Sequence, residues 1–223
     1  MYGTALALVH AAAFADTFRP AFDWLAAQVR DGFTSPRLFD LGCGDGTWLA
    51  HARDQGIPGA GIDQSEAFVR LATARRLAVT VGDAAQPLIP PGSTSVTALG
   101  EVLAYAPPSL AGAVQATARA LPPGGHFLFD LPGPDTPEST GRRTGEDWTL
   151  TARSRKHEGE ITREITVDTP AGSHTETHRQ QLFAPGEVTR LLDAAGFKAD
   201  LRDSYGPCPL LPGRFAILAR KLA

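Results

Sequence analysis

Short apolar runs alternate with helical segments along the first 131 residues, and this alternation constrains the fold more than any other feature. Strands are predicted at residues 37–41, 60–63, 79–81, 95–99 and 126–131, and helices at 47–55, 65–76 and 110–121. Strands separated by helices of about ten residues are typical of βαβ units and a parallel sheet. Ligands of such sheets bind at the carboxyl ends of the strands.

The pattern changes after residue 131. Residues 132–145 are polar and rich in proline and glycine, which predicts a loop, and strand-like runs follow at 148–155, 160–168 and 174–183. We interpret these runs as an antiparallel lid inserted after the fifth strand. A helix at 187–195 and strands at 198–203 and 214–220 then return to the core. The predicted fold is therefore α/β, with a doubly wound, mostly parallel, seven-stranded Rossmann-like sheet.

Four regions follow from this reading. We expect N-terminal cap helices in 1–35, an α/β core in 36–131, a lid or substrate insertion in 132–184, and the last helix and two strands of the core in 185–223. The N-terminal helical pattern covers residues 4–30, and Pro20 is expected to divide it.

Composition and charge exclude several classes of protein. The 223 residues are 43% hydrophobic and 20% charged, which excludes a disordered chain or a coiled coil. The net charge of −3 argues against a nucleic-acid partner. No apolar run approaches the roughly 18 residues of a membrane span, and no basic residue precedes the apolar N-terminal run. We expect a cytoplasmic protein, either monomer or homodimer, without a membrane partner.

A glycine-rich loop lies between the first predicted strand and the helix that follows it. It reads Asp40-x-Gly42-x-Gly44-x-Gly46. Glycines let the backbone approach a ligand closely, and a helix N-terminus offers free N–H groups. The spacing differs from the G-x-G-x-x-G of dinucleotide-binding loops. Asp63, at the end of the next strand, is placed to accept hydrogen bonds from a ribose diol.

These residues, with four later segments, resemble the motifs of class I S-adenosylmethionine (SAM) methyltransferases. The glycine loop resembles motif I, and the later segments are 62–65, 82–84, 121–127 and 191–197, followed by a closing strand at 214–221. Residues 100–105 and 146–148 further resemble a group of small bacterial small-molecule methyltransferases. The resemblance implies S-adenosyl-L-methionine as cofactor and S-adenosyl-L-homocysteine (SAH) as product.

The resemblance also implies roles for individual residues around the cofactor. Gly42 and Gly44, in one loop with Gly46, are expected beneath its methionine part, and Asp40 is expected to organise that loop. The ribose and adenine contacts are assigned to Asp63, Gln64, Asp83 and Ala84. Glu101 is expected to border the methyl group.

The acceptor side is predicted from residue chemistry and position. We expect catalytic roles for Glu101, which orients an amine or acts as a general base, for Tyr105, and for His10, a candidate base for a hydroxyl acceptor. Substrate contacts are predicted for Tyr2, Arg163, His178 and Tyr205. His174, Glu176 and His178 share one strand face, but no fourth ligand accompanies them, so no metal is expected.

We therefore predict a SAM-dependent methyltransferase that acts on nitrogen or oxygen of a small molecule by in-line displacement. Two alternatives remain at this point. One is an NAD-dependent oxidoreductase, against which the loop spacing counts. The other is a SAM-binding protein without catalytic activity.

Overall fold

A seven-stranded sheet forms the centre of the molecule in a computed structural model that describes residues 3–14, 17–105 and 109–223. Its strand order is β10-β13-β5-β4-β1-β2-β3. The strands are β1 Leu38–Leu41, β2 Gly59–Asp63, β3 Ala78–Val81, β4 Ser95–Ala98, β5 His126–Pro132, β10 Phe197–Arg202 and β13 Arg214–Lys221. Neighbours are parallel except β13, which runs antiparallel to β5 and β10. The predicted sheet is confirmed.

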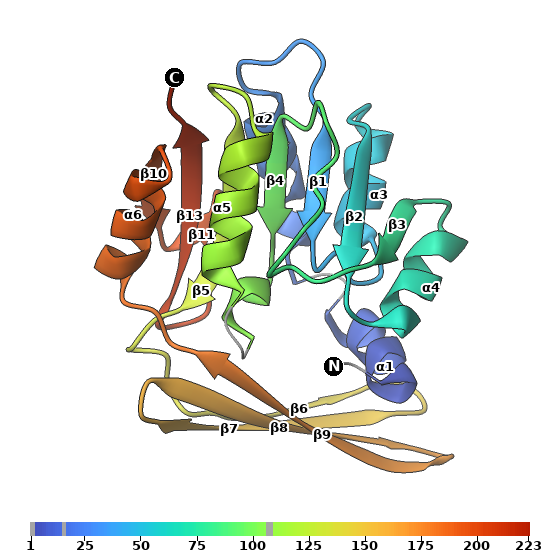
Figure 1. Cartoon of the computed structure of the whole chain (residues 1–223). Coiled ribbons are helices and arrows are strands. Elements are labelled where there is room, and N and C mark those ends of the chain that lie inside the picture. The colour runs from blue at the N-terminus through green and yellow to red at the C-terminus, as the bar shows by residue number, and fades with distance from the viewer. Residues whose placement is uncertain (1–2, 15–16, 106–108) are drawn as a thin grey trace.

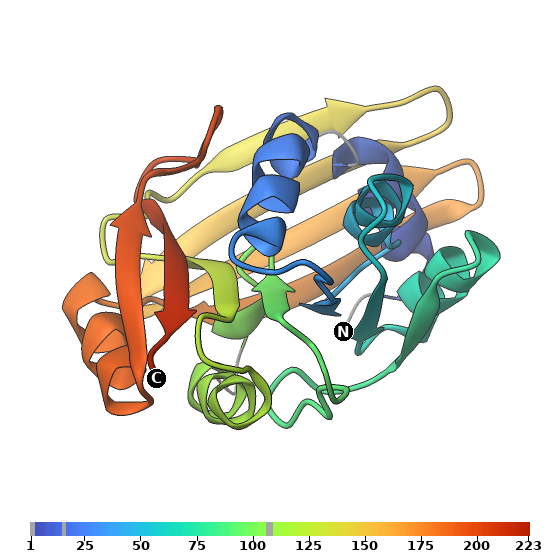
Figure 2. The same cartoon turned by 90° about the horizontal axis from the view of Figure 1, so that it is seen from above.

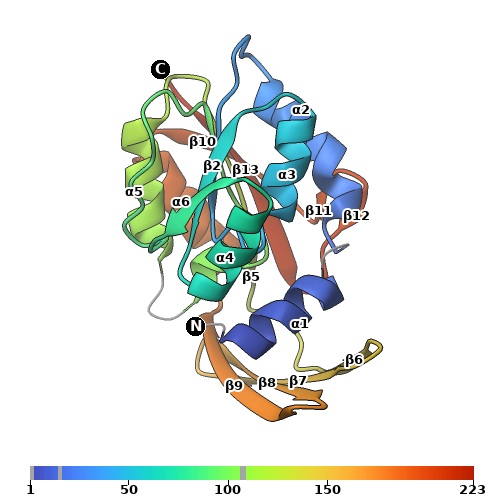
Figure 3. The same cartoon turned by 90° about the vertical axis from the view of Figure 1, so that its right-hand side faces the viewer.

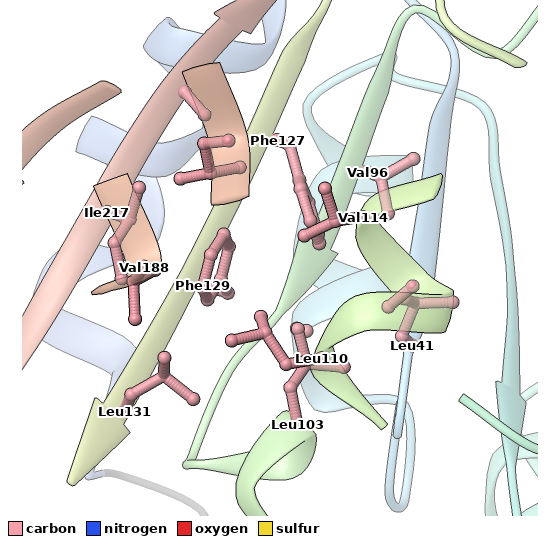
Figure 4. Close-up of a cluster of buried hydrophobic side chains, with 14 of the residues drawn as sticks. Leu41, Val96, Leu103, Leu110, Val114, Phe127, Phe129, Leu131, Val188 and Ile217 are labelled. Atoms are coloured by element: carbon pink, nitrogen blue, oxygen red, sulfur yellow. The ribbon is translucent and has the colours of Figure 1, made fainter. Parts of the chain in front are cut away.

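Helices cover both faces of this sheet (Figures 1 and 3). Helices α2 (Phe22–Arg30) and α3 (Thr47–Asp54) lie on one face, and α5 (Leu110–Ala120) and α6 (Pro185–Ala194) lie on the other. Helix α4 (Glu66–Ala74) contacts β3 and β2 at the sheet edge. The central strand β5 is buried along its whole length, as expected for a strand covered on two sides. Phe129 and Leu131 of β5 point into the cluster with Val188 of α6 and Leu110 of α5 (Figure 4).

A second, antiparallel sheet lies across the carboxyl ends of β1, β2 and β4 (Figures 1 and 2). Its order is β6 (Thr140–Thr144), β7 (Thr149–His157), β8 (Glu160–Thr169) and β9 (Gly172–Gln181). The prediction of a loop throughout 132–145 was wrong, because β6 lies within it. Every residue of β6 is exposed and the strand is held by pairing with β7, so its side chains carry no alternating pattern.

The N-terminal segment is divided, as the proline predicted. Helix α1 (Thr4–Phe14) is separate from α2, and a short 3-10 turn, η1 (Arg19–Ala21), contains Pro20. Helix α1 lies between α4 and the four-stranded sheet (Figure 3). Its Leu6 and Val9 pack against the sheet residues Leu150, Ile165 and Val167. A small hairpin of β11 (Ser204–Tyr205) and β12 (Cys208–Pro209) was not predicted.

Within the described ranges, no helix has both the length and the apolar character needed to cross a membrane.

Candidate functional site

A cavity of about 970 Å³ lies between the carboxyl ends of the parallel strands and the four-stranded sheet. Residues predicted to bind the cofactor line it: Asp40, Gly42, Gly44, Asp63, Gln64, Asp83 and Ala84. It is also lined by residues predicted to serve the acceptor: His10, Glu101, Tyr105, Arg163 and His178. Of the predicted site residues that the structure describes, Gly46 and Tyr205 do not line the cavity. Tyr2 falls outside the described residues.

The glycine loop adopts left-handed backbone conformations at Gly42, Gly44 and Gly46, with φ of 63°, 55° and 77°. A Cβ on Gly42 would lie 2.6 Å from both γ carbons of Val102, and one on Gly46 would lie 2.3 Å from Leu77 Cδ1. A Cβ on Gly44 would meet no atom within 4 Å. Packing therefore requires glycine at positions 42 and 46, whereas Gly44 leaves open space beside the cavity.

Asp63 braces this loop from the end of β2. Its Oδ2 accepts the Gly44 N–H at 2.9 Å, and its Oδ1 accepts the Ser65 N–H at 2.8 Å. Burial raises the pKa of Asp63, although these two bonds oppose the rise. Each carboxylate oxygen has a further lone pair, so the group can still accept hydrogen bonds from a ligand.

The end of β3 brings a second polar group to the cavity. Gln64 Nε2 donates to Asp83 Oδ1 at 2.9 Å, and the Ala85 N–H donates to the same oxygen at 2.8 Å. Asp83 and Gln64 therefore hold each other in place, and Ala84 is buried beside them. The arrangement presents both a carboxylate and an amide to the cavity.

Asp40 is buried beneath the glycine loop. The Thr97 hydroxyl donates to Asp40 Oδ1 at 2.5 Å, and Trp48 Nε1 donates to Thr97 Oγ1 at 3.2 Å. Burial raises the pKa of Asp40 to about 7, with the charge of Asp63 adding to the rise. A cationic ligand near this carboxyl would lower its pKa again.

Asp130 is a site residue that sequence reasoning missed. It lies in β5 and accepts the N–H groups of Gly100 and Glu101, at 2.7 and 3.0 Å, and the hydroxyl of Tyr205 at 2.9 Å. Burial and the nearby charge of Glu101 raise the pKa of Asp130 to about 7. The bonds hold Glu101 at a positive φ of 62°, unusual for this residue type. The sequence feature that could have identified Asp130 is an acidic residue inside the apolar run 126–131.

The Tyr205 hydroxyl is thus engaged in this network, and its side chain is buried. Tyr205 does not line the cavity; through Asp130 it instead supports the backbone of Glu101.

Glu101 connects the two sheets through its carboxylate. Arg163 of β8 donates to Glu101 Oε2 at 2.6 Å, and Arg214 of β13 donates to Oε1. Arg163 also donates to Gln180 of β9. Burial alone would raise the pKa of Glu101, but the two guanidinium groups hold it below its ordinary value. The group is therefore a carboxylate at neutral pH and a weak base.

Two histidines line the cavity from opposite elements. His178 of β9 is buried, with its Nε2 3.3 Å from Glu176 Oε2 and its ring edge-to-face with Tyr105 at 5.7 Å. His10 of α1 has its ring 4.6 Å from that of Phe14. Burial lowers the pKa of His178, and it lowers the pKa of His10 to about 4. Both rings are therefore neutral at neutral pH. In the described ranges, no cluster of three or more His, Cys, Asp or Glu side chains is arranged to hold a metal ion.

The sheet order, the glycine loop and the carboxylate at the end of β2 together define a class I SAM-dependent methyltransferase. The family model described as "Methyltransferase domain" matches residues 13–201, and the chain belongs to this family. It is an enzyme family, which decides against the NAD-dependent oxidoreductase, and its cofactor is SAM.

Individual relatives agree with this assignment. Nocamycin O-methyltransferase of Saccharothrix syringae is 30% identical over 210 residues, covering 86% of this chain and 69% of the relative. A SAM-dependent methyltransferase from Clostridium acetobutylicum superposes with a TM-score of 0.78 at 14% identity, covering 94% and 96% of the two chains. The sugar N-methyltransferase KedS8 from Streptoalloteichus superposes with a TM-score of 0.74 at 23% identity, covering 94% and 88%. The two structures establish the fold.

The residues present fit the cofactor. Gly44 leaves room for a ligand at the loop, Asp63 and Asp83 present carboxylates at neighbouring strand ends, and all three line a cavity of about 970 Å³. Bound SAM would supply a methyl group activated by the adjacent sulfonium.

Proposed function

We propose that this protein transfers the methyl group of SAM to an oxygen atom of a small molecule. The observation that carries the proposal is the cavity itself, which is continuous from the glycine loop to the buried face of the four-stranded sheet. A cavity of this size suits a small acceptor. The choice of oxygen is supported by the 30% identical relative, whose name describes an O-methyltransferase.

Roles at the cofactor side follow from the contacts of each residue. We assign the ribose hydroxyls to Asp63, whose oxygens retain acceptor capacity, and the adenine to Gln64, Asp83 and Ala84. The backbone of Gly42 and Gly44 faces the methionine part. Burial has raised the pKa of Asp40, and we expect the cationic end of the cofactor to lower it again.

Glu101 has a positioning role in this proposal. Its carboxylate accepts from Arg163 and Arg214, which lowers its basicity and makes it a poor proton acceptor. It instead holds Arg163, which lines the proposed acceptor end of the cavity. In-line displacement depends strongly on alignment, so a rigid acceptor end contributes directly to rate.

We infer a cytoplasmic enzyme, monomeric or dimeric, with no nucleic-acid partner. The net charge of −3 supports the last point. Light scattering on the purified protein would measure the assembly.

The test combines cofactor binding with a paired acceptor screen. Calorimetry with SAH should show binding by the wild-type protein. Radiolabelled SAM is then offered with pairs of small phenols and alcohols and the anilines and amines of the same skeletons. Label on hydroxyl members is the expected result. Transfer only to amines would contradict oxygen as the acceptor atom. Transfer to neither, by a protein that binds SAH, would contradict the proposed acceptor class.

A further inference from the structure

We propose that Asp130 is a positioning residue, whose ionised carboxylate holds Glu101 in the orientation that methyl transfer requires. The inference rests on the proposed function, in which Glu101 organises the acceptor end of the cavity. It adds that this end is set by a buried group behind the cavity wall, and that its geometry depends on the charge of that group.

Asp130 points away from the apolar core that α5 and α6 form with the sheet. Its neighbours Phe129 and Leu131 belong to that core (Figure 4), and side chains alternate between the two faces of a strand. Asp130 therefore lies on the face against which Tyr205 packs. Its partner in β13 is Ala216, which has no polar side chain. Asp130 borders the cavity but is only 1% exposed, so its carboxyl depends on donors from the protein.

Three donors converge on this carboxyl. Oδ1 accepts the Gly100 N–H at 2.7 Å and the Tyr205 hydroxyl at 2.9 Å, and Oδ2 accepts the Glu101 N–H at 3.0 Å. The two N–H groups belong to consecutive residues and reach different oxygens. A carboxylate accepts at both oxygens, whereas a protonated carboxyl or an amide has a donor of its own on one side. The arrangement therefore suits the ionised form of Asp130.

The backbone held by these bonds is of an uncommon kind. Gly100 and Glu101 have φ of 89° and 62°, and left-handed backbone costs free energy in a residue with a Cβ. On its other side, the Glu101 carbonyl accepts the Ala104 N–H at 3.0 Å and Gln180 Nε2 at 3.4 Å. Both peptide groups of Glu101 are thus bonded. Loss of the bonds to Asp130 would let this segment relax toward a commoner conformation and turn the Glu101 side chain.

The direction of the Glu101 side chain decides where two guanidinium groups lie. Its Oε2 accepts from Arg163 at 2.6 Å, and its Oε1 accepts from Arg214. Both arginines line the cavity, one from the four-stranded sheet and one from the central sheet. A rotation at Glu101 would therefore displace both groups relative to the methyl donor. Methyl transfer depends on alignment, and a displacement of about 1 Å can cost roughly 100-fold in rate.

Charged and titratable groups surround Asp130 from several elements. Glu101, after β4, and Tyr205, of β11, bond to it, and Asp40 of β1 and Cys208 of β12 act on Tyr205 in turn. Burial and the charge of Glu101 raise the pKa of Asp130 to about 7, although the three hydrogen bonds oppose the rise. Hydrogen bonds to an ionised acceptor are roughly twice as strong as neutral ones. The hold on Glu101 should therefore weaken as the pH falls through about 7.

The first experiment observes these bonds without any acceptor. NMR follows the amide signals of Gly100 and Glu101 against pH in the full-length protein with SAH. Both amide protons should shift together with a midpoint near pH 7, and Asp130→Asn should abolish the shift. Tyr205→Phe should move the midpoint to higher pH, because the tyrosine hydroxyl stabilises the charged carboxylate. Amide protons that do not titrate, or a midpoint unmoved by Tyr205→Phe, would overturn the inference.

The second experiment measures turnover on a hydroxyl acceptor from the paired screen. Asparagine has one acceptor oxygen, so Asp130→Asn cannot satisfy the N–H groups of Gly100 and Glu101 together. It should lower kcat by roughly 10- to 100-fold and leave SAH affinity near that of wild type. The control is Asp200→Asn, at a carboxylate of β10 that is 56% exposed, which should leave both quantities unchanged. Wild-type turnover in Asp130→Asn, or an equal loss of SAH affinity, would contradict a positioning role.

Tyr205→Phe separates positioning from a purely structural role. It keeps the ring, which lies 5.9 Å from that of Phe18, and removes one donor from Asp130. The acidic limb of kcat/KM for the acceptor, measured with saturating SAM, should move to higher pH, with a plateau near that of wild type. A uniform loss at every pH would indicate a structural role and overturn the inference. Methylation restricted to amines would instead contradict the proposed function, and the amide shifts are independent of that result.

Discussion

The two sides of the cavity are built in different ways. On the glycine-loop side, the contacts Gly44–Asp63 and Gln64–Asp83 each join residues 19 apart in the chain. On the side of the four-stranded sheet, Glu101 contacts residues 62 and 113 positions away. The contacts of the glycine-loop side thus join residues close in the chain at Asp63 and Asp83, whereas the side of the four-stranded sheet forms only after distant segments have come together.

The two sides also differ in charge. The loop side presents the carboxyl groups of Asp40, Asp63 and Asp83, while the opposite side presents Arg163 and Arg214 with one buried carboxylate, Glu101, between them. A cofactor with a sulfonium and an ammonium group matches the acidic side. Glu101 lies at the boundary between the two sides. Its substitution should lower stability and leave SAH affinity unchanged, which would distinguish the two sides most clearly.

The largest effect is expected for Glu101→Gln. Removal of one partner from a buried ion pair usually costs about 3–5 kcal/mol, and two guanidinium groups here lose their carboxylate. Chemical denaturation should show a loss of this order, while SAH affinity of the folded fraction is retained. The control Glu164→Gln, at an exposed position of β8, should be close to neutral. A stability equal to wild type would mean that the pairs contribute nothing to joining the sheets.

Asp63→Ala tests the loop side alone. Hydrogen bonds to a charged group contribute about 1.5–3 kcal/mol, so SAH affinity should fall by roughly 10- to 100-fold. Calorimetry measures the change, with Asp54→Ala as control because that carboxylate is 67% exposed on α3. Unchanged SAH affinity would remove Asp63 from the cofactor contacts.

Gly44→Ala and Gly159→Ala form a matched pair. Both glycines have positive φ, 55° and 82°, and a Cβ on either would meet no atom within 4 Å. Each substitution should therefore cost a similar amount of stability, about 1–2 kcal/mol, for left-handed backbone. Only Gly44→Ala should also weaken SAH binding, by about tenfold, because only Gly44 lines the cavity. Equal SAH affinities in the two variants would place the cofactor away from Gly44.

The smallest effect is a proton released when the cofactor binds. Burial raises the pKa of Asp40 to about 7, so the carboxyl is about half protonated at that pH. The ammonium group of SAH beside Asp40 lowers this pKa, and binding should then release up to about half a proton at pH 7. SAH titrations in buffers of different ionisation enthalpy measure this number. The release should vanish at pH 9 and in Asp40→Asn, and a release that persists in the variant would come from another group.

Local sequence spacing was sufficient to predict that the residues of the glycine-loop side lie together. The glycine loop, Asp63 and Asp83 each follow a strand, and the ends of adjacent parallel strands meet at one edge of the sheet. Arg163 and His178 were also identified as candidates, although nothing in the sequence indicated that Arg163 would pair with Glu101.

What the sequence determined by itself was the α/β core, the parallel direction of its central strands and the glycine loop, because these depend on periodicity and on neighbours close in the chain. Only the tertiary structure decided that Asp130 supports Glu101, that Arg214 joins Arg163 on the same carboxylate, and that Glu176 contacts both Gly3 and His178. Those contacts depend on the register of an antiparallel sheet and on where it lies against the core. The position of that sheet against the core is decided by packing between residues far apart in the chain, which a local pattern of residues does not encode.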